Sequence, residues 1–284
     1  MTKKILITGA NGQLGHEMRN ALKGNNRFEC IFTDVAELDI CNAEAVKQTI
    51  ADNHIDYIVN CAAYTQVDKA EDNTELCRKI NTDAVENLAR AAADYGARMI
   101  HISTDYVFNG RGYRPYTEDM VPDPQSVYGS TKLEGEKILT DICPESIIIR
   151  TAWLYSPYGN NFVKTMLHLG EEREELSVVA DQIGTPTCAA DLAQAILVIL
   201  QADTFVPGTY HFSDEGVCSW YDFTVTIHRL AGITTCRVTP IRSDEYPSKA
   251  HRPFYSVLDK SKIKKTYRLT IPPVSYTHLR AHET

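Results

Sequence analysis

After its first three residues the chain reads Lys4-Ile5-Leu6-Ile7-Thr8-Gly9-Ala10-Asn11-Gly12-Gln13-Leu14-Gly15. The apolar run at 4–8 predicts a buried strand, and a helical pattern over 13–22 follows the glycines. Glycine allows a tight turn, lets backbone N–H groups approach a pyrophosphate and lets the helix pack closely on the strand. Three glycines alone would be weak evidence. Between a first strand and the positive end of a first helix, they predict a dinucleotide-binding loop, formed by Gly9, Asn11, Gly12, Gln13, Leu14 and Gly15.

Apolar runs and helical patterns alternate along the first half of the chain. They predict strands at 4–8, 28–34, 57–60, 99–103 and 146–150, and helices at 13–22, 43–52, 74–95 and 126–139. Short apolar strands between helices are typical of a parallel sheet covered on both faces. Residues 1–150 are therefore predicted to form an α/β domain with a doubly wound parallel sheet, the Rossmann arrangement.

The second half is less regular and is interrupted by Pro and Gly. Helices are predicted at 161–173 and 189–202, and a strand at 209–212. We expect residues 151–273 to form mainly a smaller C-terminal substrate-binding lobe, with some elements returning to the main sheet.

The ends of the next two predicted strands supply candidate cofactor contacts. Asp34 can accept hydrogen bonds from the adenosine ribose and would repel a 2′-phosphate, although it could also be a turn aspartate. No Arg or Lys lies in 33–38 to favour NADP, and Asp39 and Ile40 are predicted to flank the adenine. Small residues after the strand at 57–60 leave room for the cofactor backbone, so the predicted contacts there are Cys61, Ala62, Ala63 and Tyr64.

The segment Tyr128-Gly129-Ser130-Thr131-Lys132 carries a Tyr-x-x-x-Lys pair. This spacing puts both side chains on one face of a helix. A nearby ammonium stabilises tyrosinate, so we expect it to lower the pKa of Tyr128 and make the phenol a usable proton donor or base. Lys132 could also hold the nicotinamide ribose. Such a pair also arises by chance on an exposed helix, and the glycine loop makes the catalytic interpretation preferable.

Hydroxyl groups follow the predicted strand at 99–103, in Ser103-Thr104-Asp105-Tyr106-Val107-Phe108. Open α/β sheets place their ligands at this end of their strands. Thr104, or less favourably Ser103, is predicted to hydrogen-bond a substrate carbonyl beside Tyr128. Either hydroxyl could instead cap a turn.

The composition of the chain excludes some classes of binding partner. The formal net charge is -8, which argues against general binding to nucleic acid or to an anionic membrane. No apolar run reaches membrane-spanning length, and the first apolar run leads into glycines rather than a cleavage site, so we expect a cytoplasmic protein. The eight cysteines form no CxxC pair and are predicted to be buried thiols in a reducing compartment.

The last segment, residues 274–284, has no convincing amphipathic period. It resembles translated sequencing-adaptor read-through, so we expect it to be a non-native tail that replaces a natural C-terminal helix. A genuine frayed terminus is the alternative.

Taken together, these residues resemble the extended short-chain dehydrogenases/reductases, and most closely the dTDP-4-dehydrorhamnose reductase family. The resemblance covers nearly the whole chain to Pro273. Beyond the glycine loop and the Thr104 and Tyr128 segments, it rests on Val59-Asn60-Cys61-Ala62-Ala63-Tyr64-Thr65-Gln66-Val67-Asp68-Lys69-Ala70-Glu71, Arg150-Thr151-Ala152-Trp153, Gly159-Asn160-Asn161-Phe162 and Asp181-Gln182-Ile183-Gly184-Thr185-Pro186-Thr187.

The resemblance implies reduction of the 4-keto group of a dTDP-sugar, dTDP-4-dehydro-L-rhamnose, by NADPH or NADH. It implies Thr104, Tyr128 and Lys132 as the catalytic triad. It implies substrate contacts from Thr104, Asp105, Tyr106, Trp153, Asn161, Gln182 and Arg252. A guanidinium suits a diphosphate, and an indole suits an apolar deoxysugar face.

The chain departs from the family at a magnesium site that joins some members as dimers. Glu17 fits the first ligand, but Ala190 stands where the second is expected, beside Asp191, and the third would lie in the tail. We therefore expect no such metal site, and either a monomer or a homodimer. The family usually accepts NADPH, whereas Asp34 favours NADH. Two alternatives stay open: a nucleotide-sugar epimerase or dehydratase, and a non-catalytic NADP-binding regulatory subunit.

Overall fold

Strand β1 (Lys3–Thr8) lies inside a six-stranded sheet with the order β10-β5-β4-β3-β1-β2. The computed structural model describes residues 2–274. The other strands are β2 (Phe28–Thr33), β3 (Tyr57–Asn60), β4 (Arg98–Thr104), β5 (Ile147–Thr151) and β10 (Gly208–His211). Every pairing in the sheet is parallel, so all six carboxyl ends meet at one edge. The predicted doubly wound α/β fold is confirmed.

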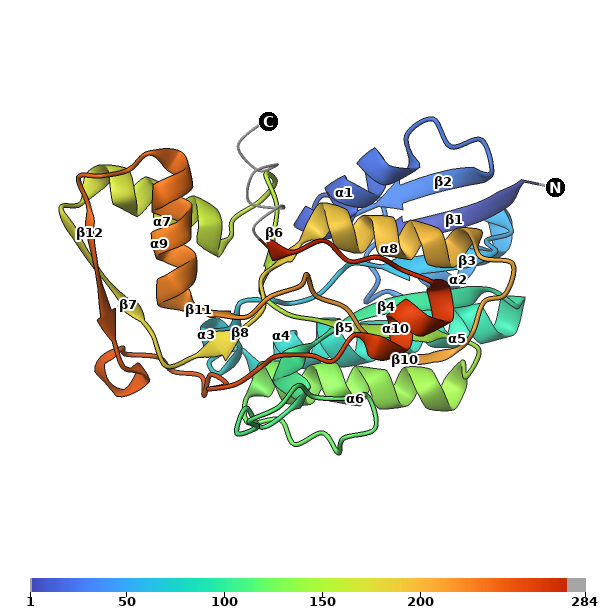
Figure 1. The fold of residues 1–284 in the computed structure, drawn as a ribbon. Helices are drawn as coiled ribbons and strands as arrows, with labels where there is room; N and C mark the ends of the chain where they lie inside the picture. The colour runs from blue at the N-terminus through green and yellow to red at the C-terminus, as the bar shows by residue number, and fades with distance from the viewer. Residues whose placement is uncertain (1, 275–284) are drawn as a thin grey trace.

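Alternating residues of the strands face opposite layers of helices. Ile5 and Ile7 pack with α1 (Gln13–Leu22) and α8 (Ala189–Gln201), whereas Leu6 packs with α2 (Ala43–Asn53) and α5 (Ala84–Tyr95). Helix α6 (Val127–Ile142) lies on the second face with α5 (Figure 1). Because both faces are covered, the strands must be apolar on both sides, which explains their unbroken apolar runs.

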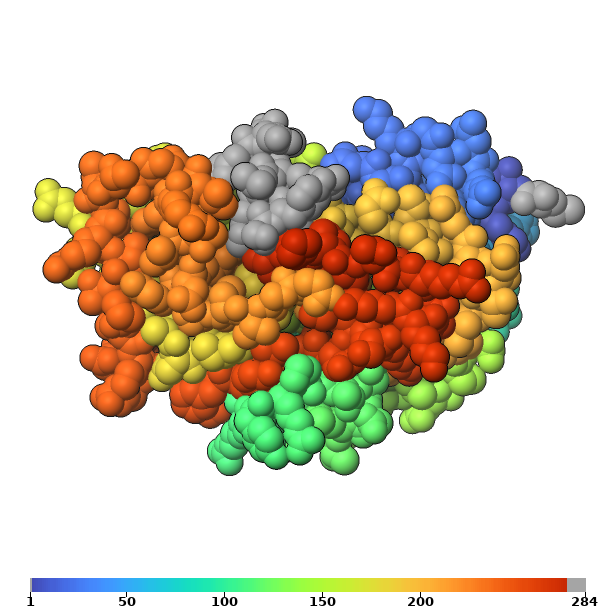
Figure 2. All heavy atoms as spheres, viewed as in Figure 1, coloured from blue at the N-terminus to red at the C-terminus, as the bar shows by residue number. Residues whose placement is uncertain are grey.

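The C-terminal part of the described chain returns to the sheet. Helix α10 (Ser261–Tyr267) contributes Ile263 and Tyr267 to the core beside α8. In the space-filling view this red segment covers the front of the sheet next to the gold α8 (Figure 2). We call the sheet with its covering helices, including α8 and α10, the sheet body.

The remaining elements form a second, smaller body that we call the lobe (left in Figure 1). It contains α7 (Phe162–Glu172), α9 (Trp220–Ala231) and the parallel pair β7 (Glu175–Val179) and β12 (Arg237–Ile241). Its separate core includes Tyr155 and Phe223. Short pairs connect it to the sheet body: β6 (Leu154–Tyr155) with β9 (Thr187–Cys188), and β8 (Ile183–Gly184) with β11 (Cys218–Ser219). The domain limits at 150 and 273 stay a prediction.

The structure corrects several predicted elements. The single helix at 74–95 is α4 (Thr74–Arg78), a π-helical turn at Lys79–Asp83, and α5. The side chain of Asn81 in that turn bonds to the backbone N and O of Tyr64, at 2.9 and 3.1 Å, which fixes the widened turn in place. Short helix α3 (Val67–Ala70), and α9, α10, β7 and β12, were not predicted.

Two further expectations concern the membrane and the tail. Among residues 2–274, no helix is both long and apolar enough to span a membrane. The predicted tail lies outside the described residues, apart from Val274.

Candidate active site

The glycine loop connects β1 to α1 at the carboxyl edge of the sheet. Gly9 has φ +63°, and a Cβ there would lie 2.6 Å from the Ala62 nitrogen, so both its conformation and the space require glycine. A Cβ on Gly15 would lie 2.3 Å from the Gly9 carbonyl oxygen, so Gly15 serves the close packing of helix on strand. Among the described residues no side chain caps the first turn of α1, whose N–H groups are thus available to an anion.

One cavity of about 410 Å³ lies beside this loop. Of the predicted cofactor residues it is lined by Gly9, Gly12, Asp34, Asp39, Ile40, Cys61, Ala62 and Ala63. Asp34 is held by two backbone donors: its Oδ2 accepts from the Asn11 N–H at 2.9 Å and its Oδ1 from the Val35 N–H at 2.8 Å. The cavity is also lined by Lys79 of the π-helical turn. Sequence reasoning missed this cation because it lies more than forty residues after the segment that was searched for one.

A second cavity, of about 510 Å³, brings the predicted catalytic residues together. Thr104, Tyr128 and Lys132 line it, together with Gly12, Gln13 and Leu14 of the glycine loop. The lobe closes its far side with Trp220 and Asn161. The cavity therefore spans the sheet edge, the loop and the lobe.

Thr104 ends β4, where its side chain makes several polar contacts. Its hydroxyl donates to Asp105 Oδ1 at 3.0 Å and accepts from the Tyr106 N–H at 3.2 Å. It also hydrogen-bonds the Tyr128 phenol, but burial outweighs that bond and raises the Tyr128 pKa above its ordinary value. The expectation that the lysine would lower the pKa of Tyr128 is therefore wrong for this arrangement.

The Lys132 amine does not lower the pKa of Tyr128 because it is directed toward β4. The Nζ donates to the Ile102 carbonyl oxygen at 2.6 Å and lies 3.2 Å from His101 Nε2. Burial lowers the pKa of Lys132 to about 8, although the charge of Glu136 acts in the opposite direction. Tyr128 and Lys132 therefore line the same cavity from one face of α6, but the Lys132 amine hydrogen-bonds to β4 and not to the phenol.

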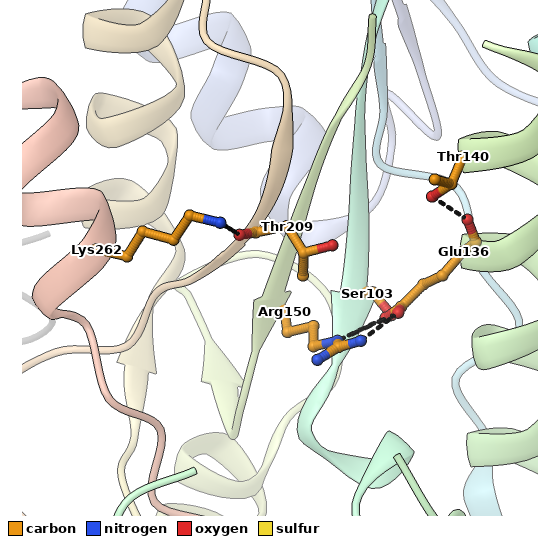
Figure 3. Close-up of polar contacts among 6 residues, drawn as sticks. All are labelled: Ser103, Glu136, Thr140, Arg150, Thr209 and Lys262. Atoms are coloured by element: carbon orange, nitrogen blue, oxygen red, sulfur yellow. Dashed lines mark hydrogen bonds and ion pairs between the residues drawn. The ribbon is translucent and has the colours of Figure 1, made fainter. Parts of the chain in front are cut away.

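Ser103 belongs to a buried ionic cluster instead. Its hydroxyl donates to Glu136, which forms a two-point ion pair with Arg150 at 3.0 and 2.6 Å (Figure 3). Both charged side chains are 5% exposed. Ser103 also lines the larger cavity, but its hydroxyl is held by this buried ionic cluster.

Two of the predicted substrate residues line the cavity beside Tyr128. Burial raises the pKa of Asp105 to about 7. Tyr106 meets the Tyr128 ring edge-on, with ring centroids 5.4 Å apart.

Arg252 lines the cavity from the other side. It donates to Tyr106 at 3.4 Å and pairs with Asp68 at 2.5 Å, an acidic partner that sequence reasoning missed. The carboxylate fixes the guanidinium in place while leaving other N–H donors.

Trp153 and Asn161 form the lobe side. Trp153, with φ +49°, stacks on Trp220 at a centroid distance of 3.4 Å. Asn161 caps α7 and also donates to Gln13 Oε1 at 2.9 Å, which joins the lobe to the glycine loop. The sequence could have predicted the position of Trp220, because the Ser219–Asp222 capping box indicates a helix that begins at this tryptophan.

The structure does not bring Gln182 and Tyr64 to either cavity lining. Gln182 is 6% exposed and donates to Ser243 Oγ at 3.0 Å in the lobe. Tyr64 is tied by its backbone to the π-helical turn. Among residues 2–274 no group of three acidic, histidine or cysteine side chains could hold a metal, and Glu17 accepts from Asn20 at 3.2 Å.

The two cavities share Gly12, Cys61 and Ala63 in their linings. Together with the fold they define a dinucleotide-binding α/β protein of the extended short-chain dehydrogenase/reductase type. Residues 3–280 match the RmlD substrate binding domain family, and the chain belongs to this family. It is 41% identical to a dTDP-4-dehydrorhamnose reductase of Aggregatibacter actinomycetemcomitans, over 93% of each chain.

Solved structures agree. A dTDP-4-dehydrorhamnose reductase of Clostridium acetobutylicum has a TM-score of 0.94 and 47% identity, and the match covers 99% of this chain and 98% of that one. A dTDP-4-dehydrorhamnose reductase of Bacillus anthracis in complex with NADP has a TM-score of 0.96 and 40% identity, with full coverage of both chains. The predicted family is confirmed.

Proposed function

We propose that this protein reduces the 4-keto group of dTDP-4-dehydro-L-rhamnose to the hydroxyl of dTDP-L-rhamnose with NADPH or NADH. The relatives that are about 40% identical over nearly the whole chain are named as reductases of this substrate. The observation that carries the proposal is that Thr104, Tyr128 and Lys132 line one cavity with the glycine loop.

In this proposal Tyr128 is the proton donor. Burial keeps the phenol in its neutral form, which is the form that can give a proton to the developing alkoxide. The Thr104 hydroxyl bonds the same phenol and is proposed to hold the substrate oxygen beside it. When bound, the nicotinamide supplies the hydride that turns the keto carbon into a carbinol carbon.

Residues of the smaller cavity are proposed to hold the adenosine part of the cofactor. The loop at Gly9 and the uncapped start of α1 fit a pyrophosphate. Asp34 favours ribose hydroxyls, while Lys79 offers a cation for a 2′-phosphate. Both cofactors are therefore proposed as substrates of the reaction.

The sugar nucleotide is proposed to occupy the larger cavity. Arg252, already oriented by Asp68, suits the diphosphate, and the Trp153 indole suits the apolar face of a deoxysugar. Asp105, Tyr106 and Asn161 complete the proposed contacts. We further propose a cytoplasmic enzyme that acts as a monomer or homodimer.

The test follows cofactor oxidation at about 340 nm with the 4-keto-L-rhamnose nucleotide, using NADH and NADPH in parallel. Stoichiometric loss of cofactor absorbance and formation of dTDP-L-rhamnose are expected. Sugar conversion without net cofactor consumption would point to an epimerase or dehydratase, and cofactor binding without turnover would point to a regulatory subunit. Either result would overturn the proposal.

A further inference from the structure

A buried chain of polar groups crosses three strands of the sheet and ends at Lys132. The Thr8 hydroxyl donates to Asn60 Oδ1 at 2.7 Å, and Asn60 Nδ2 lies 3.0 Å from His101 Nδ1. The other ring nitrogen, His101 Nε2, lies 3.2 Å from Lys132 Nζ. All four residues are at most 1% exposed, with His101 and Asn60 at 0%. Neither of those two was among the predicted site residues.

The directions of these hydrogen bonds follow from one backbone group. The Ala62 N–H donates to Asn60 Oδ1 at 3.2 Å, and a backbone N–H can only donate. Oδ1 must therefore be the acceptor end of the Asn60 amide, and Nδ2 must be the donor end. Since Nδ2 faces His101 Nδ1, that ring nitrogen accepts through its lone pair, and the proton of the neutral ring is on Nε2.

The Nε2–H group then points at the Lys132 amine. A protonated ammonium has three donors and no lone pair. If Lys132 were charged, one of its N–H donors would therefore face the Nε2–H donor of His101 with no acceptor between them. An uncharged amine has a lone pair that can accept from His101 Nε2–H. It still has hydrogens with which to donate to the Ile102 carbonyl oxygen at 2.6 Å.

We propose that Asn60 and His101 are positioning residues that lock the imidazole as its Nε2–H tautomer and thereby disfavour the ammonium form of Lys132. The functional meaning rests on the proposed role of Lys132 at the nicotinamide ribose. The amine then loses its charge at about pH 8, below the pH at which an ordinary lysine does so, and cofactor binding becomes pH-dependent.

The groups around Lys132 agree with this assignment. The charged or titratable groups that face it are His101 on β4, Cys77 on α4, and Glu136 and Tyr128 on its own helix. Glu136 would favour an ammonium, but Arg150 already pairs with it. Burial lowers the pKa of Lys132 to about 8 and the pKa of His101 well below its usual range.

The decisive test reads the tautomer directly. Long-range ¹H–¹⁵N NMR of the full chain, labelled at histidine, distinguishes Nδ1–H, Nε2–H and doubly protonated rings. The protein supplies its own references. His211 Nδ1 lies 3.0 Å from the Tyr116 carbonyl oxygen and so must carry a proton there, whereas His228 Nε2 lies 2.9 Å from the Met166 carbonyl oxygen. His101→Gln and His211→Gln variants assign the signals.

At neutral pH we expect His101 to match the His228 pattern and to differ from the His211 pattern. An Nδ1–H ring or an imidazolium at His101 would overturn the proposal, whether or not the protein reduces a sugar. This result is therefore independent of the proposed function.

A second readout follows NADPH affinity against pH through cofactor fluorescence. Affinity should decrease as the pH rises through about 8, where Lys132 loses its charge. His101→Leu removes the opposing N–H and should move this decrease upward by about one pH unit. His211→Leu, a matched change at a buried histidine outside the cavity lining, should leave its position unchanged. An unchanged profile in His101→Leu would contradict the proposal.

Discussion

The sheet body and the lobe of this protein are built differently. The sheet body buries short apolar strands between two helix layers, and it presents Thr104, Tyr128 and Lys132 at the carboxyl edge of the sheet. The lobe has a small aromatic core and reaches the site through single side chains such as Asn161 and Trp220. The difference indicates that the sheet body fixes the proposed chemistry, whereas the lobe fixes what is bound.

The largest expected effect is on the chemistry of the sheet body. Tyr128→Phe removes the proposed proton donor while keeping the ring, so kcat should decrease by about 10²- to 10⁴-fold. NADPH affinity and the unfolding temperature should change little. Steady-state kinetics with the keto sugar, together with a cofactor titration, measure this. Wild-type turnover in the variant would remove Tyr128 from the mechanism.

The two cores can be compared with one type of substitution. Leu88 of α5 is 0% exposed in the sheet body, and Leu176 of β7 is 5% exposed in the lobe. Truncation of a buried leucine to alanine costs about 2–5 kcal/mol. We expect Leu88→Ala near the upper end of that range and Leu176→Ala near the lower end, because the smaller core can relax.

Urea unfolding with two probes, tryptophan fluorescence for the lobe and far-UV circular dichroism for the whole, checks this expectation. The order of the two variants carries the comparison. Equal losses of unfolding free energy would show that the lobe core is as tightly packed as the sheet body.

Asp105, in the cavity between the sheet body and the lobe, makes the free energy of unfolding depend on pH. Its pKa is about 7 in the folded protein against an ordinary value of 3.8, because burial disfavours the carboxylate. A raised pKa means that the folded state binds the proton more tightly, so this stabilisation is complete below about pH 4 and is lost as the pH rises toward 7. The neutral Asp105→Asn side chain lacks this titration.

Relative to wild type, Asp105→Asn should therefore gain stability between pH 4 and pH 7, by up to a few kcal/mol. Urea unfolding of both proteins at each pH measures the difference, in which the other carboxylates cancel. A constant difference across this range would show that Asp105 is ionised throughout.

The smallest expected effect concerns the link between lobe and loop. Asn161→Asp keeps the oxygen that caps α7 but loses the Nδ2 donor to Gln13 and to the Ser156 carbonyl oxygen. Each lost hydrogen bond is worth about 1 kcal/mol, and only the one to Gln13 joins the lobe to the loop, so KM for the sugar nucleotide should increase by at most about tenfold. Thermal stability should decrease less in this variant than in Asn161→Ala, which also loses the cap. A normal KM would mean that the link does not shape the site.

Predictability also differs between the two bodies. The strands of the sheet body and its helices α1, α2 and α8 were predicted to within a residue or two, because apolar strands and amphipathic helices have strong local patterns. In the lobe, β12 was missed. Pro240 within it argues against a strand. Among residues 2–274, however, β12 pairs with β7 alone, so one of its edges can lack a hydrogen-bond donor. Helix α9 had a readable capping box that was overlooked.

The candidate site shows the same division. The spacing of Tyr128 and Lys132 on one helix face was sufficient to bring them to one cavity. It could not show that the amine bonds to β4, since that depends on a contact thirty residues away in sequence. Gln182 followed a family motif, but its amide bonds to Ser243 instead of lining the cavity.

The local sequence pattern was sufficient to predict the class of fold, the glycine loop and the proposed catalytic side chains. These features depend on helix and strand periods and on glycine geometry, which are properties of neighbouring residues. The protonation states of the site residues and their hydrogen-bond and ion-pair partners were decided only by the tertiary structure. Asp68 beside Arg252, Lys79 beside the cofactor cavity, and Asn60 and His101 behind Lys132 come from distant segments. Burial and hydrogen-bond direction, which set the charge of a group, exist only once those segments are packed together.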